Sequence, residues 1–373
     1  MRAPVKPAEQ SFRSLLVRPL PGPLFAAILT ISSLVLACEI LIDRWVTKIA
    51  PVEPRAAVLA NLYDEELYDR RAIVLVGGSA LDELSPWELD SEICGAGAPP
   101  VLRKLTFGGQ TIGMSLSILQ NLRAAPGSIV SMHVNYFRMG GAPEALETEV
   151  RRAALPLPDT SAQRQLLIKF GRDAEAEPFR LRYYRSFLYS YIEVRLWPLR
   201  GAVKEQLSTA PLDPSGWAEV IRNAFRPAPF RPTAVRFSTP EPLAAKRSSL
   251  LERLEEETRA LSENMDFNLA ALSMADQIAK DKGFRLILID TPHDPALLSD
   301  VEGMTKIYKR ATDGFKQRGL RHVDLRTGEN LDTQNFRDLV HVVTSGRDRF
   351  NTRWQRLLTS LSAGICNRKS AGD

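Results

Sequence analysis

Three side chains in this sequence have the types and the spacing that acyl transfer requires. Ser79 ends the run Gly77-Gly78-Ser79 after a short apolar stretch, and Asp338 and His341 lie three residues apart near the C-terminus. Residues three apart can share one face of a helical turn, so the carboxylate can orient the imidazole. The other ring nitrogen can then take a proton from a serine, because the ordinary pKa of histidine lies near neutral pH. Each motif also has a simpler interpretation, a glycine turn in the first case and a surface ion pair in the second.

Apolar runs predict the sheet that would position Ser79. The runs at 72–76, 129–134 and 284–289 are short and mostly apolar, as the central strands of a parallel sheet are. Leucines at helical spacing predict a helix over about 248–280. Strands that alternate with helices indicate an α/β fold with right-handed crossovers. Ser79 then lies at the carboxyl edge of the sheet, where ligands of open α/β folds bind.

Four motifs in order resemble the sequence blocks of the SGNH/GDSL hydrolase superfamily. They are Gly-Gly-Ser79, Phe107-Gly-Gly109-Gln-Thr, His133-Val-Asn135-Tyr136 and Asp338-x-x-His341. The resemblance covers about residues 71–135 and 284–355. It implies an SGNH-like (flavodoxin-like) three-layer sandwich with a parallel central sheet.

The resemblance also implies a role for each matched residue. Ser79 would attack an ester carbonyl, His341 would act as general base and then as general acid, and Asp338 would orient the imidazole. The backbone N–H groups of Ser79 and Gly109, with the side-chain amide of Asn135, would form the oxyanion hole. Donors of this kind stabilise the negative charge that develops in the transition state.

The first and third blocks depart from the superfamily pattern. Gly78 stands where an aspartate usually precedes the serine, and the third block has His133 for glycine and Tyr136 for aspartate. These departures are similar to a divergent envelope branch that includes the D-alanyl-transfer protein of teichoic-acid modification and the alginate O-acetylation proteins. Members of that branch pair a membrane anchor with an exported domain. The resemblance therefore implies acyl transfer onto an envelope polymer, with a multi-spanning membrane O-acyltransferase as a possible partner.

The N-terminal region contains an apolar stretch of bilayer-crossing length. Residues 19–38 carry no charge, and the apolar character continues to Ile42 apart from Glu39, whereas a spanning helix needs about 20 residues. By the positive-inside rule, four preceding basic residues keep the N-terminus cytoplasmic: Arg2, Lys6, Arg13 and Arg18. We expect an uncleaved single-pass anchor in the inner (cytoplasmic) membrane and a periplasmic or extracellular catalytic domain. A cleaved signal peptide and a lipoprotein cleavage box ending at Cys38 are the alternatives.

The remainder of the chain is expected to form one domain with an insertion. The alternation of strands and helices breaks at about 140–242, which holds a basic aromatic segment at 179–195 and then a proline-rich stretch. We interpret this stretch as an inserted lid region. Its aromatic segment could stack on sugar rings, rest at the bilayer interface or pack as a helix on the core. The expected layout is a cytoplasmic tail at 1–18, a transmembrane anchor at 19–45, a juxtamembrane connector at 46–70, an SGNH-like domain at 71–365 and a tail at 366–373.

Charge, cysteines and histidines narrow the choice of partners. The net charge is +5 with dispersed arginines, which indicates no nucleic-acid partner and favours an anionic lipid surface or an acidic glycan. Cys94 and Cys366 could form a disulfide in an oxidising compartment, although two distant cysteines indicate this only weakly. His133 and His293 are possible substrate-binding residues, and each could instead be a packed or capping histidine at a strand end. No metal-ligand spacing is present, so we expect neither a metal nor a cofactor.

These patterns together predict an extracytoplasmic, membrane-anchored serine acyltransferase or esterase. Its substrate would be the O-acyl groups, most simply acetyl groups, of an envelope polysaccharide or acylated glycan, and its site a Ser-His-Asp triad. The alternative is a non-catalytic SGNH-fold scaffold in a complex that modifies or exports an envelope polymer. The missing aspartate at position 78 favours that alternative.

Overall fold

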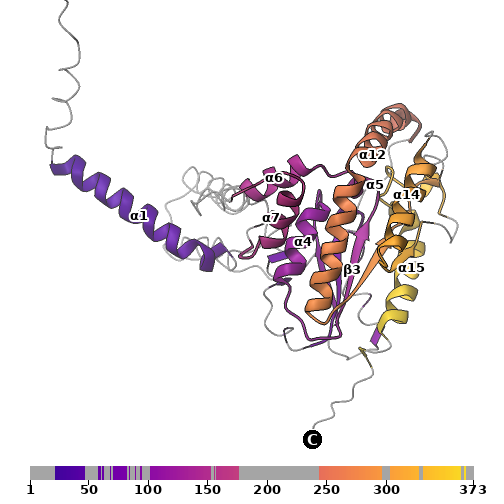
Figure 1. The fold of residues 1–373 in the computed structure, drawn as a ribbon, viewed down its shortest axis with the longest axis horizontal. Helices are drawn as coiled ribbons and strands as arrows, with labels where there is room; N and C mark the ends of the chain where they lie inside the picture. The colour runs from indigo at the N-terminus through magenta and orange to yellow at the C-terminus, as the bar shows by residue number, and fades with distance from the viewer. Residues whose placement is uncertain are drawn as a thin grey trace, which may run out of the picture.

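The computed structural model of the chain describes a parallel sheet with helices on both faces. The residues described are 22–46, 58–59, 61–62, 68, 70–81, 84, 89, 93–94, 101–152, 155, 157–175, 243–295, 303–326, 331–362 and 365–366. Within them the fold is α/β, as the alternation of apolar strands and helices predicts (Figure 1).

Five parallel strands form the sheet, in the order β2-β1-β3-β4-β5. The strands are β1 (Ile73–Gly77), β2 (Leu102–Thr106), β3 (Ile129–Val134), β4 (Arg285–Asp290) and β5 (His322–Asp324). The predictions for β1, β3 and β4 are confirmed, because these strands coincide with the three predicted apolar runs to within one residue. Neither β2 nor β5 was predicted. Arg103 and Lys104 interrupt the apolar pattern of β2, and β5 has only three residues.

The order of the strands reverses at one point in the sheet. The chain passes from β1 outward to β2, and then returns to β3 on the other side of β1. A ligand of a doubly wound sheet binds in the crevice at such a switch point, outside the carboxyl ends of the strands. Any side chain that follows β1 or β3 is therefore well placed to meet a substrate.

Helices of the described segments connect and cover these strands. They are α1 (Gly22–Val46), η3 (Ser79–Leu81), α4 (Ile112–Asn121), α5 (Tyr136–Met139), α6 (Pro143–Arg152), α7 (Ser161–Lys169), α12 (Leu243–Asp281), α14 (Met304–Gln317), η5 (Thr333–Asn335) and α15 (Thr344–Ser362). The long helix predicted at 248–280 is confirmed as α12, which begins five residues earlier.

Two apolar clusters lie on opposite faces of the sheet and make the arrangement three-layered. Side chains of a strand alternate between faces, so Val74 and Val76 of β1 join one cluster while Ile73 and Leu75 join the other. The first cluster packs against α4, α12 and α14. The second is covered by α15, whose Trp354 is fully buried in it. Figure 1 shows α4 and α12 on the same face of the sheet.

The N-terminal apolar stretch forms helix α1, close to the range expected for an anchor. Its described apolar side chains are exposed, with Leu34 at 64% and Leu36 at 62%. Figure 1 places α1 apart from the sheet. Of the helices that the structure describes, none has the combination of length and hydropathy needed to cross a membrane. Residues 1–18 and most of 46–70 lie outside the described residues.

The first part of the expected insertion packs on the helical layer. Helices α6 and α7 lie against α4: Gln163 of α7 donates to the carbonyl of Gly113 at 3.0 Å, and a Cβ at Gly113 would lie 2.4 Å from the Leu146 side chain of α6. The segment at 179–195 and the proline-rich stretch lie outside the described residues.

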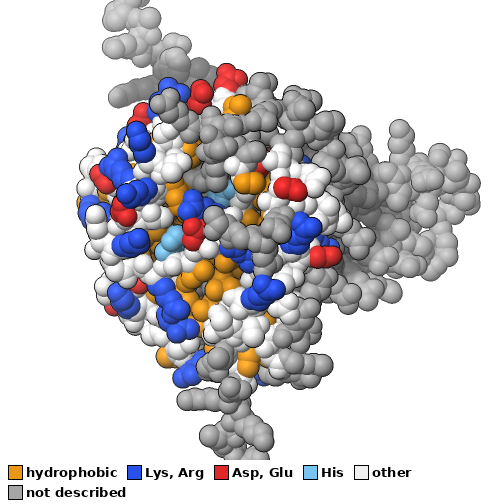
Figure 2. All heavy atoms as spheres, turned by 90° about the vertical axis from the view of Figure 1, so that its right-hand side faces the viewer, with side chains coloured by type: hydrophobic (Ala, Val, Ile, Leu, Met, Phe, Trp, Pro, Cys, Tyr) orange, Lys and Arg blue, Asp and Glu red, His pale blue; other side chains and the backbone are white. Residues whose placement is uncertain are grey.

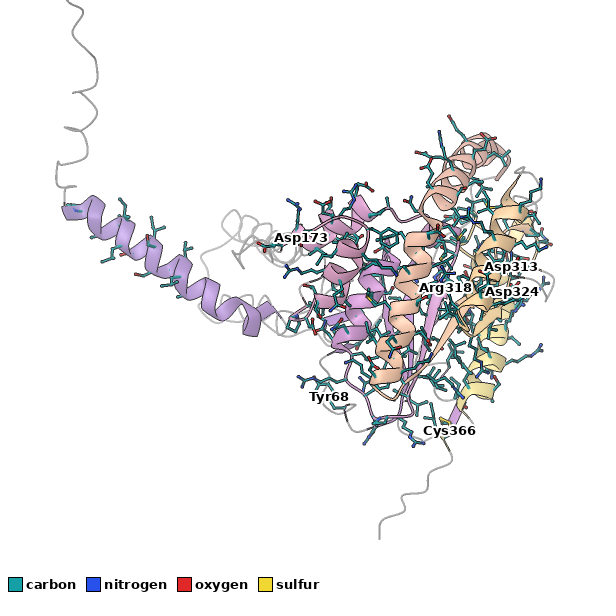
Figure 3. All side chains as sticks on the ribbon, in the orientation of Figure 1. Tyr68, Asp173, Asp313, Arg318, Asp324 and Cys366 are labelled. Atoms are coloured by element: carbon teal, nitrogen blue, oxygen red, sulfur yellow. A yellow bond between two sulfur atoms is a disulfide. The ribbon has the colours of Figure 1, made fainter. Side chains whose placement is uncertain are left out.

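A disulfide links two segments that are distant in the chain. Cys94 and Cys366 are bonded, with their Cα atoms 5.4 Å apart and 272 residues between them. Cys366 lies just beyond α15 (Figure 3). The bond thus joins the region that follows Ser79 to the helix that follows His341.

Candidate active site

Close packing at the end of β1 positions Ser79. A Cβ at Gly77 would lie 2.6 Å from Cβ of His133 and 2.8 Å from Cδ1 of Leu81, so only glycine fits there. The chain then turns at Gly78 into η3, whose Leu81 is buried and whose backbone N–H bonds the Gly78 carbonyl at 3.1 Å. Ser79 is partly exposed as a result, at the carboxyl edge of the sheet and next to the switch point.

Asp338 and His341 lie in a loop between η5 and α15. The sequence interpretation placed them on a helical turn, and this is wrong in detail. Phe336 and Val342 form an antiparallel bridge that closes the loop, and both side chains are buried. Within the loop, Asp338 Oδ1 accepts the backbone N–H groups of Val340 at 3.1 Å and of His341 at 3.0 Å. This carboxylate-capped turn, rather than helical periodicity, brings the two side chains together.

Ser79, His341 and Asp338 form a continuous hydrogen-bonded line. His341 Nδ1 lies 2.8 Å from Asp338 Oδ2 and 2.9 Å from Oδ1, and His341 Nε2 lies 2.9 Å from Ser79 Oγ. The carboxylate only accepts, so we assign the ring proton to Nδ1. Nε2 then has a free lone pair facing the serine hydroxyl, which is the tautomer that a general base requires.

The carboxylate of Asp338 stays ionised at neutral pH. Burial raises the pKa of this group, but the hydrogen bond from His341, the field of that ring and two backbone N–H groups outweigh burial and lower it to about 2. The side chain is 32% exposed, and that of His341 is 15% exposed. A fixed negative charge behind the imidazole favours the imidazolium that forms when a serine proton is taken.

A cavity of about 220 Å³ opens beside Ser79. Its walls include the three residues of the hydrogen-bonded line, and also Gly109 and Asn135, which the sequence predicted as oxyanion donors. The structure therefore brings together five predicted residues from four separate motifs.

Gly109 and Asn135 each occupy a conformation suited to donation. Gly109 has φ of +74°, in the left-handed region that favours glycine, in the turn after β2. Asn135 follows β3, and its Oδ1 accepts the backbone N–H of Arg138 at 3.0 Å, which caps α5. Because the oxygen is used within the protein, the amide nitrogen is the end that is left for a ligand.

His133 and His293 occupy different positions relative to the cavity. His133 lines it, and its Nε2 lies 3.0 Å from Thr291 Oγ1. Burial, and then the charge of Arg138, hold the pKa of His133 well below its usual range, so the ring is neutral. His293 is not among the residues that line this cavity as the described segments form it. It is buried, 3.7 Å from Asp290 Oδ1, and burial lowers its pKa to about 3.

One charged residue of the cavity was not predicted from the sequence. Arg138 is buried and lines the cavity beside Asn135. A cation within the apolar run Tyr136-Phe137-Arg138-Met139 is the available signal, because arginine is rarely buried unless its donors are satisfied.

Neither a metal-binding group among the described residues nor a similar known protein indicates the chemistry of this site. Across the described ranges, no group of three or more His, Cys, Asp or Glu side chains could hold a metal ion. The chain matches no protein-family model and no curated protein.

Proposed function

We propose that this chain is an SGNH-type serine esterase or acyltransferase that acts on O-acyl groups. The observation on which the proposal rests is the unbroken line from Asp338 through His341 to Ser79, which ends in a cavity beside two oxyanion donors. His341 and Ser79 are 262 residues apart in the chain. A local turn or a surface ion pair does not account for a meeting over that distance.

The geometry supports a two-step acyl transfer. Ser79 Oγ bonds to the carbonyl carbon of the ester while its proton passes to His341 Nε2, and Asp338 stabilises the imidazolium. The N–H groups of Ser79 and Gly109 and the amide of Asn135 bind the oxyanion, each worth on the order of 3 kcal/mol of barrier. The ester C–O bond then breaks, and the leaving alcohol takes the proton from His341. Water or an acceptor hydroxyl attacks the acyl-serine by the same steps in reverse.

The position of each motif supports the SGNH assignment. Ser79 follows β1, Gly109 follows β2 and Asn135 follows β3, so all three lie at the carboxyl edge of the sheet. Asp338 and His341 precede α15 and reach the same edge. The aspartate that this chain lacks at position 78 is not a member of the hydrogen-bonded line, so its absence removes none of the three contacts.

Three features support a site outside the cytoplasm and at a membrane. Helix α1 exposes apolar side chains, and basic residues precede it in the sequence. The Cys94–Cys366 disulfide is typical of oxidising compartments. On the face in Figure 2, lysine and arginine side chains are more frequent than acidic ones, which suits an anionic glycan or lipid surface. We therefore propose an envelope polysaccharide as the acyl acceptor or donor, and a multi-spanning O-acyltransferase as a partner.

A fluorophosphonate probe and an acetyl-ester substrate test the proposal. We expect the probe to label Ser79 in the wild type, and Ser79→Ala and His341→Ala each to abolish both labelling and turnover. Ser360→Ala is the matched control, because Ser360 lies on the exposed side of α15 and bonds only its own helix among the described contacts. A folded wild type that neither labels nor turns over ester would contradict catalysis and favour the scaffold alternative.

A further inference from the structure

Arg138 has an unusual set of contacts for a buried cation. Its side chain donates four hydrogen bonds, and every acceptor is a neutral oxygen. Nε donates to the carbonyl of Gln110 at 2.9 Å, and Nη2 donates to that of Thr111 at 2.9 Å. Nη1 donates to the carbonyl of His133, and Nη2 also to Ser115 Oγ. No carboxylate is among its hydrogen-bond partners in the described part of the chain.

These acceptors belong to the segments that present the oxyanion donors. Gln110 and Thr111 directly follow Gly109. His133 precedes Asn135 by two residues, and the backbone N–H of Arg138 itself bonds Asn135 Oδ1. Arg138 therefore bonds the segment after β2 and the end of β3 with its side chain, and it bonds Asn135, directly after β3, with its backbone N–H.

The third oxyanion donor, the N–H of Ser79, also lies next to Arg138. A Cβ placed on Gly78 would be in ordinary van der Waals contact with Arg138 Cδ, at 3.8 Å. The aliphatic part of the arginine thus lies beside the turn that presents Ser79. One side chain thus bonds two of the segments from which the oxyanion hole would be built, and lies beside the third.

The segment after β2 is held at Phe107, Gln110 and Thr111, whereas the two glycines between them have no side chains to fix them. Gly108 and Gly109 are exposed, and within the described segments no atom beyond the chain neighbours lies within 4 Å of where a Cβ on Gly109 would be. A pair of glycines leaves the backbone free to change its dihedral angles. With no side chain to pack, the neighbouring carbonyl oxygens of Gln110 and Thr111 are the available points of attachment.

We propose that Arg138 is a positioning residue for the oxyanion hole, which holds the N–H of Gly109 and the amide of Asn135 at a fixed separation. The proposal rests on the acyl-transfer function above. A displacement of about 1 Å in such donors is enough to weaken catalysis strongly. The positive charge of Arg138 adds to the effect, because a cation beside a low-dielectric cavity stabilises a developing oxyanion.

The charge of Arg138 persists at neutral pH. Burial lowers its pKa to about 9, and the Glu149 carboxylate opposes that effect. Glu149 is engaged by the hydroxyl of Thr111, which donates to it at 2.9 Å. The guanidinium therefore remains a cation whose hydrogen bonds end on neutral oxygens.

Turnover of an acetyl ester by Arg138→Met and Arg138→Lys is the first test. Methionine keeps the length of the aliphatic chain without donors, so we expect kcat to fall on the order of 100-fold with KM changed less than about threefold. Lysine keeps the charge but cannot reach all four acceptors. The kcat of Arg138→Lys should therefore lie between that of the wild type and that of Arg138→Met. Added guanidinium ion should restore part of the activity of Arg138→Ala, while methylammonium should not.

Arg103→Met is the matched control for the loss of a buried arginine. Arg103 is 4% exposed and Arg138 is 6% exposed, but Arg103 lies in β2, outside the cavity lining, and donates to the carbonyl of Arg123. Arg103→Met should lower thermal stability without changing kcat. An equal loss of kcat in both variants would reduce Arg138 to a general stability role and overturn the proposal.

Hydrogen exchange in a Ser79→Ala background separates this proposal from the proposed function. We expect Arg138→Met to speed amide exchange in residues 107–115 and 133–139, while α12 serves as the folding control. Faster exchange there, together with a wild type that shows no esterase activity, would support the positioning role of Arg138 and contradict the proposed function. An active wild type whose Arg138→Met variant shows unchanged exchange and unchanged kcat would overturn the positioning role alone. If Arg138→Met also loses protection in α12, the variant is generally destabilised. The intermediate kcat of Arg138→Lys and the rescue of Arg138→Ala by guanidinium then test the positioning role, and the absence of both would overturn it.

Discussion

The replacement Asp338→Asn tests the assigned tautomer of His341 directly. The asparagine Oδ1 can still accept the backbone N–H groups of Val340 and His341, so the turn is preserved. The oxygen is then committed to the backbone, and the NH2 end faces His341 Nδ1. A donor opposite Nδ1 forces the ring proton onto Nε2, which then faces Ser79 as a donor and cannot take the hydroxyl proton.

The expected effect on activity is large, and the effect on stability is measurable but does not unfold the protein. The wrong tautomer in a Ser-His-Asp site costs about 10⁴-fold in kcat. For stability, the folded pKa of about 2 lies below the ordinary value of 3.8, and each unit corresponds to about 1.4 kcal/mol. Because the group is partly exposed, we take the contribution of the carboxylate as about 2 kcal/mol.

The sign of the pH dependence follows from the lowered pKa of Asp338. A carboxyl whose pKa is lower in the folded state stabilises that state at every pH above the unfolded value. This stabilisation is lost as the pH falls from about 4 to about 2. Asp338→Asn should therefore remove one component of acid unfolding in that window and leave the rest of the profile unchanged.

The assay is single-turnover acylation by an acetyl ester, with denaturant unfolding measured between pH 2 and pH 7. Asp324→Asn is the matched control: Arg326 bonds Asp324 at 2.6 Å and outweighs burial to lower its pKa, but Asp324 does not line the cavity. Figure 3 shows Asp324 beside α14. The control should lose acid-sensitive stability and keep its acylation rate. An Asp338→Asn variant that folds and acylates within tenfold of the wild type would refute the tautomer assignment.

Two further substitutions test the parts around the hydrogen-bonded line. Asn135→Ser keeps an oxygen that can cap α5 but removes the amide donor. We therefore expect kcat to fall about 10²–10³-fold with little change in thermal stability. An unchanged kcat would show that Asn135 is not part of the oxyanion hole. Gly77→Ala places a Cβ 2.6 Å from Cβ of His133 and should lower the free energy of unfolding by about 1–3 kcal/mol. Gly78→Ala is its control, since the nearest atom would be 3.8 Å away, and equal stabilities of the two variants in urea would contradict the packing at the end of β1.

The central strands and the three-residue line could be predicted because their signals are local. The runs that form β1, β3 and β4 are buried on both faces, apart from Arg285 at the start of β4, and are therefore mostly apolar. The serine after β1 and the Asp338–His341 pair are local patterns as well. The order of the four motifs, which resembles that of the SGNH blocks, led us to assign the serine and the pair to one site. Strand β2 escaped prediction because Lys104 points its ammonium to the carbonyl of Leu84, a contact that no periodicity reveals.

The geometry of the loop and the role of Arg138 depend on contacts between distant segments. Asp338 and His341 meet in a loop closed by a bridge between Phe336 and Val342. The prediction that the two side chains meet was therefore correct, whereas the helical turn predicted between them was wrong. Arg138 bonds residues 23 to 28 positions earlier in the chain. Its acceptors are mostly backbone carbonyl groups, which every sequence has, and so nothing in the residue types could have named them.

Two of the departures from the SGNH pattern, at positions 133 and 78, adjoin other residues of the candidate site. The Cβ of His133, which stands in place of glycine in the third block, leaves no space for a side chain at Gly77 in the first. Gly78, which stands in place of aspartate, adjoins the stem of Arg138. A carboxylate at position 78 would lie beside that guanidinium and neutralise part of its field. With glycine there, the hydrogen bonds of Arg138 end on neutral oxygens and Glu149 is the carboxylate that acts on its charge. Under the proposed function, more of that charge is then available to an oxyanion in the cavity. Under the proposed function, the glycine at position 78 therefore fits the charge balance of this site, and its presence does not require a loss of catalysis.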